Sequence, residues 1–151
     1  MTPTIRAYKE SDWAAIEKIH DSARIMELKL AGLEEAFLPL RIAAEREGLL
    51  EYPGLFVAEL DQKVVGFTAC SEDELAWLYV DPAHMRKGIG RCLSEYALQQ
   101  FPGIRFIEAL KGNEPARKLY ESLGFAVVGV ETGQMPGNEA FTVEVYSMEK
   151  K

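Results

Sequence analysis

Hydrophobic and polar residues follow two different periods along the chain, and each change of period marks an expected element. Short apolar runs rich in β-branched and aromatic residues predict strands at 5–9, 54–60, 64–70, 74–80, 104–110, 125–131 and 141–148. Apolar residues at helical spacing predict helices at 11–23, within 33–47, at 89–100 and at 113–123. Strands that alternate with helices in this order predict an α+β fold, or a mixed α/β sheet, with helices on its faces.

Residues with strong positional preferences mark the ends of several of these elements. Ser11 or Asp12 is a good N-cap for the first helix, and Asn113 is a good N-cap for the last one. Gly124 is expected to end that last helix. The Gly- and Pro-containing segment 132–140 is expected to be a loop between the last two strands.

Length and charge narrow the class of protein. The chain has 151 residues, which predicts a single domain over residues 1–151. Its formal net charge of -7 weighs against nucleic-acid and anionic-membrane partners, and it fits a cationic or amine-bearing substrate. The N-terminus lacks the apolar core of a signal peptide, and no run is long enough to span a membrane. We therefore expect a cytoplasmic protein.

The cysteines and histidines give no sign of special chemistry. Cys70 and Cys92 both lie within apolar patterns, so we expect two buried, reduced thiols. His20 and His84 have no Cys or Asp partners at metal-binding spacing, so no metal site is expected.

The segment RKGIGR, residues 86–91, places three basic residues around two glycines where a strand gives way to a helix. The first N–H groups of a helix have no intrahelical partner, and glycines let a bulky anion approach the backbone. The segment therefore predicts a phosphate-binding turn. A loop with solvated charges is the alternative. Leu93 stands where a dinucleotide fingerprint needs a third glycine, and no G-x-x-x-x-G-K-[ST] motif occurs, so both of those motifs are excluded.

Two spaced motifs resemble those of the GNAT superfamily of N-acyltransferases. The run LYVDP followed by residues 86–91 is similar to the family's turn motif Gln/Arg-x-x-Gly-x-Gly/Ala, with Met85 where Gln or Arg is usual. The family's later motif, Asn-x-x-Ala-x-x-x-Tyr-x-x-x-Gly-Phe, is matched by Asn113, Ala116, Tyr120, Gly124 and Phe125. The resemblance extends over nearly the whole chain in element order. It implies a twisted, mixed but mostly antiparallel sheet of about six or seven strands with helices on both faces.

The resemblance also implies a reaction, in which the acetyl group of acetyl-coenzyme A passes to a primary amine by direct attack in a ternary complex. An alkylamine has a pKa near 10.4, so a carboxylate or a water-relayed base must take its proton at pH 7. Tyr120 matches the family's tyrosine that protonates the leaving thiolate. Glu74 falls where family members often carry the base, although Leu78, whose amide should face the thioester, is about 13 Å further along the strand. Glu108 on the neighbouring strand is the reserve candidate.

The same resemblance implies a set of coenzyme contacts. Residues 78–80 match the strand whose backbone pairs with the pantetheine arm, and residues 86–91 match the pyrophosphate cradle. Asn113 can both cap its helix and meet the coenzyme. The complete implied set is Leu78, Tyr79, Val80, Arg86, Lys87, Gly88, Ile89, Gly90, Arg91, Asn113, Ala116 and Tyr120.

No motif encodes the acceptor. In the family it is framed by the first two helices, here about residues 11–48, and by the loop 132–140. We expect the acidic residues of these segments to be solvated charges that together favour an amine-bearing small molecule over an acidic one: Asp21, Glu27, Glu34, Glu35 and Glu139. A protein or peptide amine is the alternative acceptor. A catalytically inactive coenzyme-A-binding sensor and an interaction protein whose turn binds another anion are the alternative functions, and a homodimer stays open.

Overall fold

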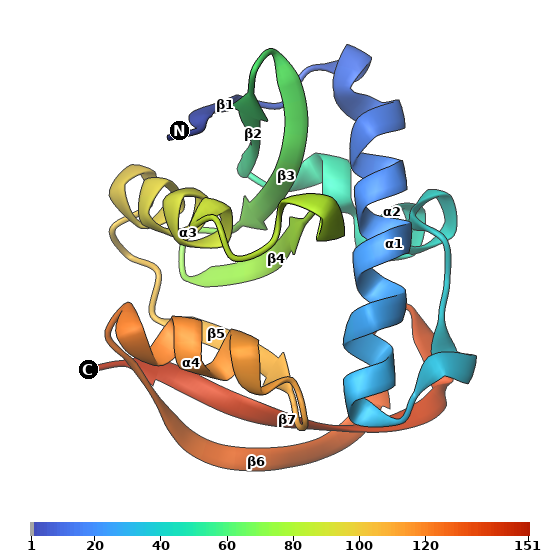
Figure 1. The fold of residues 1–151 in the computed structure, drawn as a ribbon. Coiled ribbons are helices and arrows are strands. Elements are labelled where there is room, and N and C mark those ends of the chain that lie inside the picture. The colour runs from blue at the N-terminus through green and yellow to red at the C-terminus, as the bar shows by residue number, and fades with distance from the viewer. Residues whose placement is uncertain (1) are drawn as a thin grey trace.

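The computed structural model describes residues 2–151, and a seven-stranded sheet forms its centre (Figure 1). The strand order is β1-β2-β3-β4-β5-β7-β6, and every neighbouring pair is antiparallel except β4 and β5. This arrangement confirms the expected mixed, mostly antiparallel sheet. The strands are β1 Thr4–Ala7, β2 Gly54–Leu60, β3 Lys63–Cys70, β4 Glu74–Val80, β5 Phe106–Leu110, β6 Phe125–Met135 and β7 Asn138–Lys150.

Helices cover both faces of the sheet, with α1 and α2 on one face and α3 and α4 on the other (Figure 1). Each face has its own apolar core, because successive strand residues point to opposite sides. Phe67 and Trp77 pack with Ile16 of α1, whereas Leu75 and Ile107 pack with Tyr120 of α4. The helices are α1 Trp13–Ala31, α2 Leu40–Glu47, α3 Ile89–Gln100 and α4 Glu114–Ser122, with single 3-10 turns at Glu10–Asp12, Glu34–Ala36, Leu49–Glu51 and Pro82–His84.

The segment 132–140, predicted to be a loop, is mostly paired strand. β6 continues to Met135 and β7 begins at Asn138, which leaves a two-residue turn whose Gly137 has φ 75°. Local composition favoured a loop, but the side chain of Met135 is 3% exposed in a cluster with Leu28 of α1. Burial against the helix therefore overrides the weak strand propensity of this stretch.

The predicted cap of α1 has the expected position but lacks the expected hydrogen bond to the helix. Asp12 occupies the N-cap position, but its side chain makes no cap hydrogen bond to the helix. Its carboxylate instead accepts hydrogen bonds from the N–H of Lys9 and from both terminal nitrogens of Arg6, each at 2.8 Å. Arg6 also pairs with Glu59 of β2. The Arg6–Asp12 ion pair therefore fixes strand β1 to the start of α1, and the Asp12 side chain in it is nearly buried.

Asp12→Asn is expected to lower the free energy of unfolding by about 1–3 kcal/mol at pH 7, because it removes the charge from a nearly buried ion pair. The hydrogen bonds from Arg6 lower the pKa of Asp12 below 3.8 in the folded protein. The ion pair therefore contributes fully above about pH 4, and its contribution disappears as pH falls through the lowered pKa. Urea titrations from pH 7 to pH 3 should show the difference shrinking. Glu10→Gln, at an exposed position, is the matched control and should change little.

The predicted cap of α4 agrees with the structure, whereas α1 continues to Ala31, well beyond its predicted end at residue 23. Asn113 caps α4, since its side-chain oxygen accepts a hydrogen bond from the N–H of Ala116 at 3.3 Å. Cys70 is buried as expected, but Cys92 is only half-buried, and both thiols are free. Within residues 2–151, no helix has the length and apolar character needed to cross a membrane.

Candidate active site

The parallel strands β4 and β5 pair only at their beginnings. Glu74 pairs with Phe106 and Leu75 pairs with Ile107, after which the two strands diverge (Figure 1). The other edge of β4 stays paired with β3 as far as Val80. Backbone groups of β4 that face β5 beyond Leu75 therefore have no strand partner in the described chain, although they lie in the middle of the sheet. Such groups need a partner from a ligand or from water. Residues 78–80 lie in this unpaired stretch.

The predicted phosphate-binding turn lies directly after β4, at the start of α3. Gly88 is the N-cap of α3 with φ 78°, and no side chain caps the helix. Among residues 2–151, the N–H groups of Ile89, Gly90 and Arg91 have no backbone acceptor, whereas the next N–H, of Cys92, bonds to the Gly88 carbonyl at 3.0 Å. Ile89 is 2% exposed and anchors the turn on the core. The turn thus presents three free donors at the positive end of a helix dipole.

The basic residues of the turn divide into two groups. Arg86 and Lys87 are exposed, and neither takes part in an ion pair within the described residues. Arg91 instead donates a hydrogen bond to the Ser122 hydroxyl of α4 at 2.7 Å and pairs with Glu95. A Cβ on Gly88 would meet no atom within 4 Å, so the space above the turn is open. Free donors, two unpaired cations and open space fit a phosphate group.

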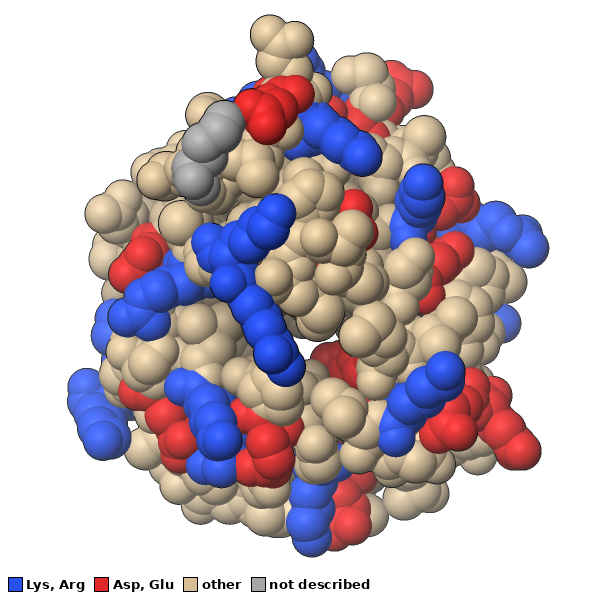
Figure 2. Space-filling view, viewed as in Figure 1, with Lys and Arg blue, Asp and Glu red and all other residues tan. Residues whose placement is uncertain are grey.

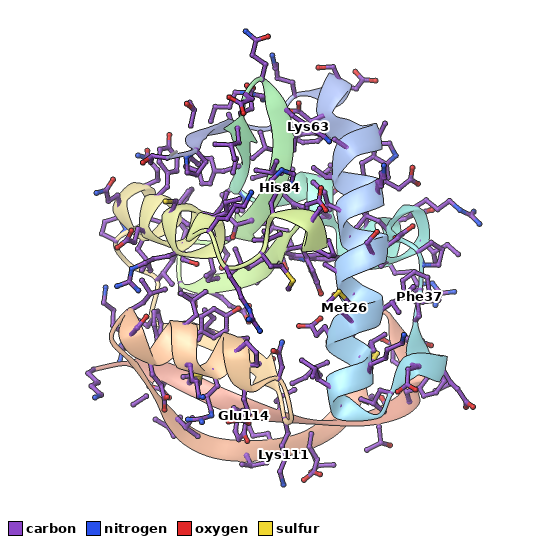
Figure 3. All side chains as sticks on the ribbon, in the orientation of Figure 1. Met26, Phe37, Lys63, His84, Lys111 and Glu114 are labelled. Carbon is purple, nitrogen blue, oxygen red and sulfur yellow. The ribbon has the colours of Figure 1, made fainter. Side chains whose placement is uncertain are left out.

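The opening between β4 and β5 is visible as a hollow near the centre of the molecular surface, with basic side chains beside it (Figure 2). Helices α1 and α4 flank this region, and Met26 and Glu114 are labelled on them in Figure 3. Tyr120 of α4 lies in the core beside this opening and is 7% exposed. Burial, together with the charge of Glu27, raises the pKa of the Tyr120 hydroxyl well above its ordinary value. The hydroxyl therefore keeps its proton near neutral pH.

Glu27 of α1 connects elements on both sides of the opening. Its carboxylate accepts hydrogen bonds from the Tyr79 hydroxyl at 2.9 Å and from the Asn113 side-chain amide at 3.1 Å. It also accepts one from Arg24 at 2.6 Å. The expectation that Glu27 is a solvated charge is therefore wrong, since this carboxylate joins α1, β4 and the start of α4. Asp21, expected to be solvated as well, accepts a hydrogen bond from the N–H of Leu40 at 2.9 Å and so ties α1 to α2.

A cavity of about 160 Å³ lies on the face of the sheet that α1 and α2 cover. Its apolar and aromatic walls come from α1, α2, β4, β5 and the β6–β7 turn, as the family resemblance implies for an acceptor site. That turn is held in place by Arg46, which donates to the Gly137 carbonyl at 2.8 Å, and by Asn138, which donates to the Ala36 carbonyl at 2.8 Å. The polar side chains that line the cavity are His20, Arg24, Glu27, Glu47, Tyr79, Glu108 and Asn138.

The two candidate bases occupy different positions relative to this cavity. Glu108 of β5 lines its wall, whereas Glu74 lies outside the wall at the point where β4 and β5 still pair. Partial burial raises the pKa of both carboxylates, with a further increase at Glu74 from the charge of Glu108. Their roles as bases stay predictions.

Comparison with known proteins decides the family. The family described as "Acetyltransferase (GNAT) domain" matches residues 51–127, half of the chain, including β4, the turn at 86–91 and α4. The chain belongs to the GNAT acetyltransferase family. The matched region ends just after the Asn113–Phe125 motif, so both motifs fall inside it.

Individual GNAT proteins resemble the chain to different extents. Peptidyl-lysine N-acetyltransferase YiaC of Escherichia coli is 34% identical over 84 residues, which are 55% of this chain and 57% of YiaC. Mycothiol acetyltransferase of Thermomonospora curvata is 33% identical over 99 residues, covering 59% of this chain and 33% of that protein. The chain thus spans little more than half, or less, of these relatives. The structure of yncA from Salmonella typhimurium with its cofactor acetyl-CoA superposes with a TM-score of 0.71 at 23% identity, covering 100% and 94% of the two chains, and shows the shared fold.

Arg24 and Glu47 are cavity residues that neither the residue patterns nor the GNAT resemblance indicated. A signal for Arg24 was present, because His20, Arg24 and Glu27 recur at helical spacing. They continue the buried stripe that begins at Ile16, so polar residues on this stripe indicate a polar cavity rather than solvent. No comparable signal marks Glu47, which reaches the cavity because α2 ends there.

Proposed function

We propose that the protein transfers the acetyl group of acetyl-coenzyme A to the primary amine of a small molecule. The observation that carries this proposal is the unpaired edge of β4 next to the open, donor-rich turn at the start of α3. An extended ligand that carries amides at one end and a pyrophosphate at the other can use both features at once. Membership of the GNAT family supports the same reaction.

In the proposed reaction, the neutral amine nitrogen attacks the carbonyl carbon of the thioester. The carbon–sulfur bond then breaks, and its electron pair leaves with sulfur as a thiolate. Tyr120, whose hydroxyl is protonated near neutral pH, donates its proton to that thiolate and later regains one from solvent. Unpaired backbone N–H groups of β4 are suited to stabilise the negative charge that develops on the thioester oxygen. The nitrogen loses one proton in forming the amide.

We propose Glu74 as the group that receives this proton through water, with Glu108 as the alternative. Glu108 is supported by its place in the cavity wall, and Glu74 by its motif position. Raised pKa values make both carboxylates stronger bases than free ones.

Replacing the true base by glutamine is expected to lower kcat/KM roughly 10²-fold near pH 7, the usual contribution of a positioned base. The deficit should shrink as pH approaches the amine pKa, near 10.4, because solvent then supplies neutral amine. Glu74→Gln and Glu108→Gln should be compared across pH 6.5–9.5, with Glu72→Gln at an exposed position as control. A deficit independent of pH would assign a positioning role, and no deficit in either variant would leave the proton to water held by backbone groups.

The small size of the cavity supports a small acceptor over a peptide. Its volume of about 160 Å³ is below the range of roughly 300–1,000 Å³ typical of pockets for drug-sized ligands. The β6–β7 turn also covers one side of it.

An acceptor screen tests this assignment by measuring the coenzyme-A thiol released from acetyl-coenzyme A. The screen should contain amino acids, polyamines and lysine-containing peptides, and turnover with a small amine is the expected result. Faster turnover of the peptides would instead favour a protein acceptor. Binding of acetyl-coenzyme A without turnover of any amine would indicate the inactive sensor. A melting temperature that acetyl-coenzyme A does not raise would favour the interaction protein.

A further inference from the structure

We infer that the acceptor carries a carboxylate as well as its amine, and that the Arg24 guanidinium binds that carboxylate. The substrate class is thus a small amino acid with a free carboxylate. This inference rests on the proposed function and concerns the same cavity. It differs from the expectation, drawn from the acidic residues, that the acceptor is an amine-bearing molecule rather than an acidic one.

Arg24 presents a guanidinium to the cavity with most of its donors unused. The side chain is 20% exposed and lines the cavity from the middle of α1. One terminal nitrogen donates to Glu27 at 2.6 Å, and the other lies 3.7 Å from the sulfur of Met135, a weak acceptor. A guanidinium has five N–H donors in a planar fork that matches a carboxylate. No other acceptor bonds to Arg24 within residues 2–151, so its remaining donors are available to a ligand in the cavity that it lines.

The carboxyl groups around Arg24 do not use its full charge and hydrogen-bonding capacity, so an anionic ligand can still bind to it. Glu27 already accepts hydrogen bonds from Tyr79 and Asn113, so it shares its charge among three donors. Glu47 also lines the cavity, but no hydrogen bond or ion pair of the described chain includes it. Burial, opposed by the charge of Arg24, raises the pKa of Glu47 to about 7. Near neutral pH this carboxyl is therefore protonated about half the time, and it then offers an O–H donor beside the guanidinium.

A second carboxylate of the cavity lining is suited to the amine. Glu108 belongs to that lining, at the point where β5 has separated from β4. Tyr79 lines the cavity next to Arg24, since both donate to the same oxygen of Glu27, and its hydroxyl is close enough to Tyr120 for the charge of one to affect the pKa of the other. An acceptor held by Arg24 through its carboxylate would extend its amine past Tyr79 toward Tyr120, beside which we propose that the thioester lies. A peptidyl-lysine side chain has no carboxylate to offer Arg24.

The test compares matched acceptors that differ only in this group. Wild-type protein should be assayed with acetyl-coenzyme A and a panel of α- and ω-amino acids, each beside its own carboxamide, with putrescine and a lysine peptide included. We expect kcat/KM for the best acid to exceed that for its amide about 10²-fold, since the neutral amide cannot make the charge-assisted hydrogen bonds that a carboxylate makes to the guanidinium. In Arg24→Gln this ratio should fall to near one, and in Arg24→Lys it should be intermediate. Lys29→Gln, an exposed change on the same helix, should keep the wild-type ratio.

The outcomes separate this inference from the proposed function. If no amine releases coenzyme-A thiol, the proposed function fails. If amines are acetylated but acids and amides react equally, or putrescine or the peptide reacts faster than every acid, the carboxylate inference is wrong. The carboxylate inference is also wrong if Arg24→Gln lowers kcat/KM for the acid and for its amide by the same factor. The wild-type comparison stays decisive if Arg24→Gln does not fold, which its melting temperature and acetyl-coenzyme A affinity would reveal.

Discussion

Tyr120→Phe is expected to reduce kcat at least about 10²-fold while acetyl-coenzyme A affinity changes little. The variant keeps the ring that packs among Leu75, Ile107 and Phe125, so the core should stay intact. It removes only the hydroxyl, whose proton we propose is transferred to the leaving thiolate. Because the loss appears in kcat and not in binding, it assigns the residue to the chemical step. Steady-state kinetics and calorimetry together measure both quantities.

A matched control separates this effect from a general loss of a tyrosine hydroxyl. Tyr96 of α3 packs edge-on against Phe56, away from the cavity, so Tyr96→Phe should retain near wild-type kcat. If Tyr120→Phe also retains wild-type kcat, the thiolate leaves without help from this residue. A matching loss of coenzyme affinity would show that Tyr120 acts by binding.

Gly88→Asp is expected to weaken acetyl-coenzyme A binding by about 10²-fold or more. It places a carboxylate beside the free N–H groups that should hold phosphate, and opposed like charges cost several kcal/mol. Gly88 has φ 78°, so the effect of backbone strain must be separated from the effect of charge. In Gly88→Asn, the new side chain has nearly the same size as Asp and the same tolerance for positive φ, but it lacks the charge. The loss of acetyl-coenzyme A affinity in Gly88→Asn should be at most about tenfold. Calorimetry on both variants gives the comparison.

Equal losses in the two variants would assign the effect to backbone strain and not to charge. Unchanged affinity in folded Gly88→Asp would show that phosphate binds elsewhere. Arg86→Ala should cost less than Gly88→Asp, because the backbone donors of the turn remain. The reverse order would mean that side-chain charge, and not the helix N-terminus, holds the anion.

Local signals in the sequence were sufficient for most elements and for both family motifs. β4 was placed residue for residue, and the cap at Asn113 followed from its side chain, because each depends on neighbours within a few positions. The failures depended on partners distant in the chain. Asp12 bonds to Arg6, which also pairs with β2, and the segment 132–135 is strand because Met135 packs against α1.

The cavity proposed to bind the acceptor was the least predictable part for the same reason. Glu27 and Arg24 are ordinary charged residues in sequence, and only the approach of α1 to the separated strands gives them partners. Charge counting therefore led to the expectation of an amine acceptor but missed the guanidinium of Arg24 among the carboxylates of the cavity. The helical spacing of His20, Arg24 and Glu27, which continues the buried stripe of α1, would have predicted the polar cavity better than the count of charges.

The separation of β4 from β5 also bears on how long the folded protein persists. The two central strands of the sheet pair at only two positions, so a bound ligand can supply hydrogen bonds that the neighbouring strand does not. If acetyl-coenzyme A fills that role, its concentration sets part of the stability of the chain, by about 2.7 kcal/mol at a hundred times the dissociation constant. Abundance of the protein would then follow the supply of its own acetyl donor, without any separate regulatory site.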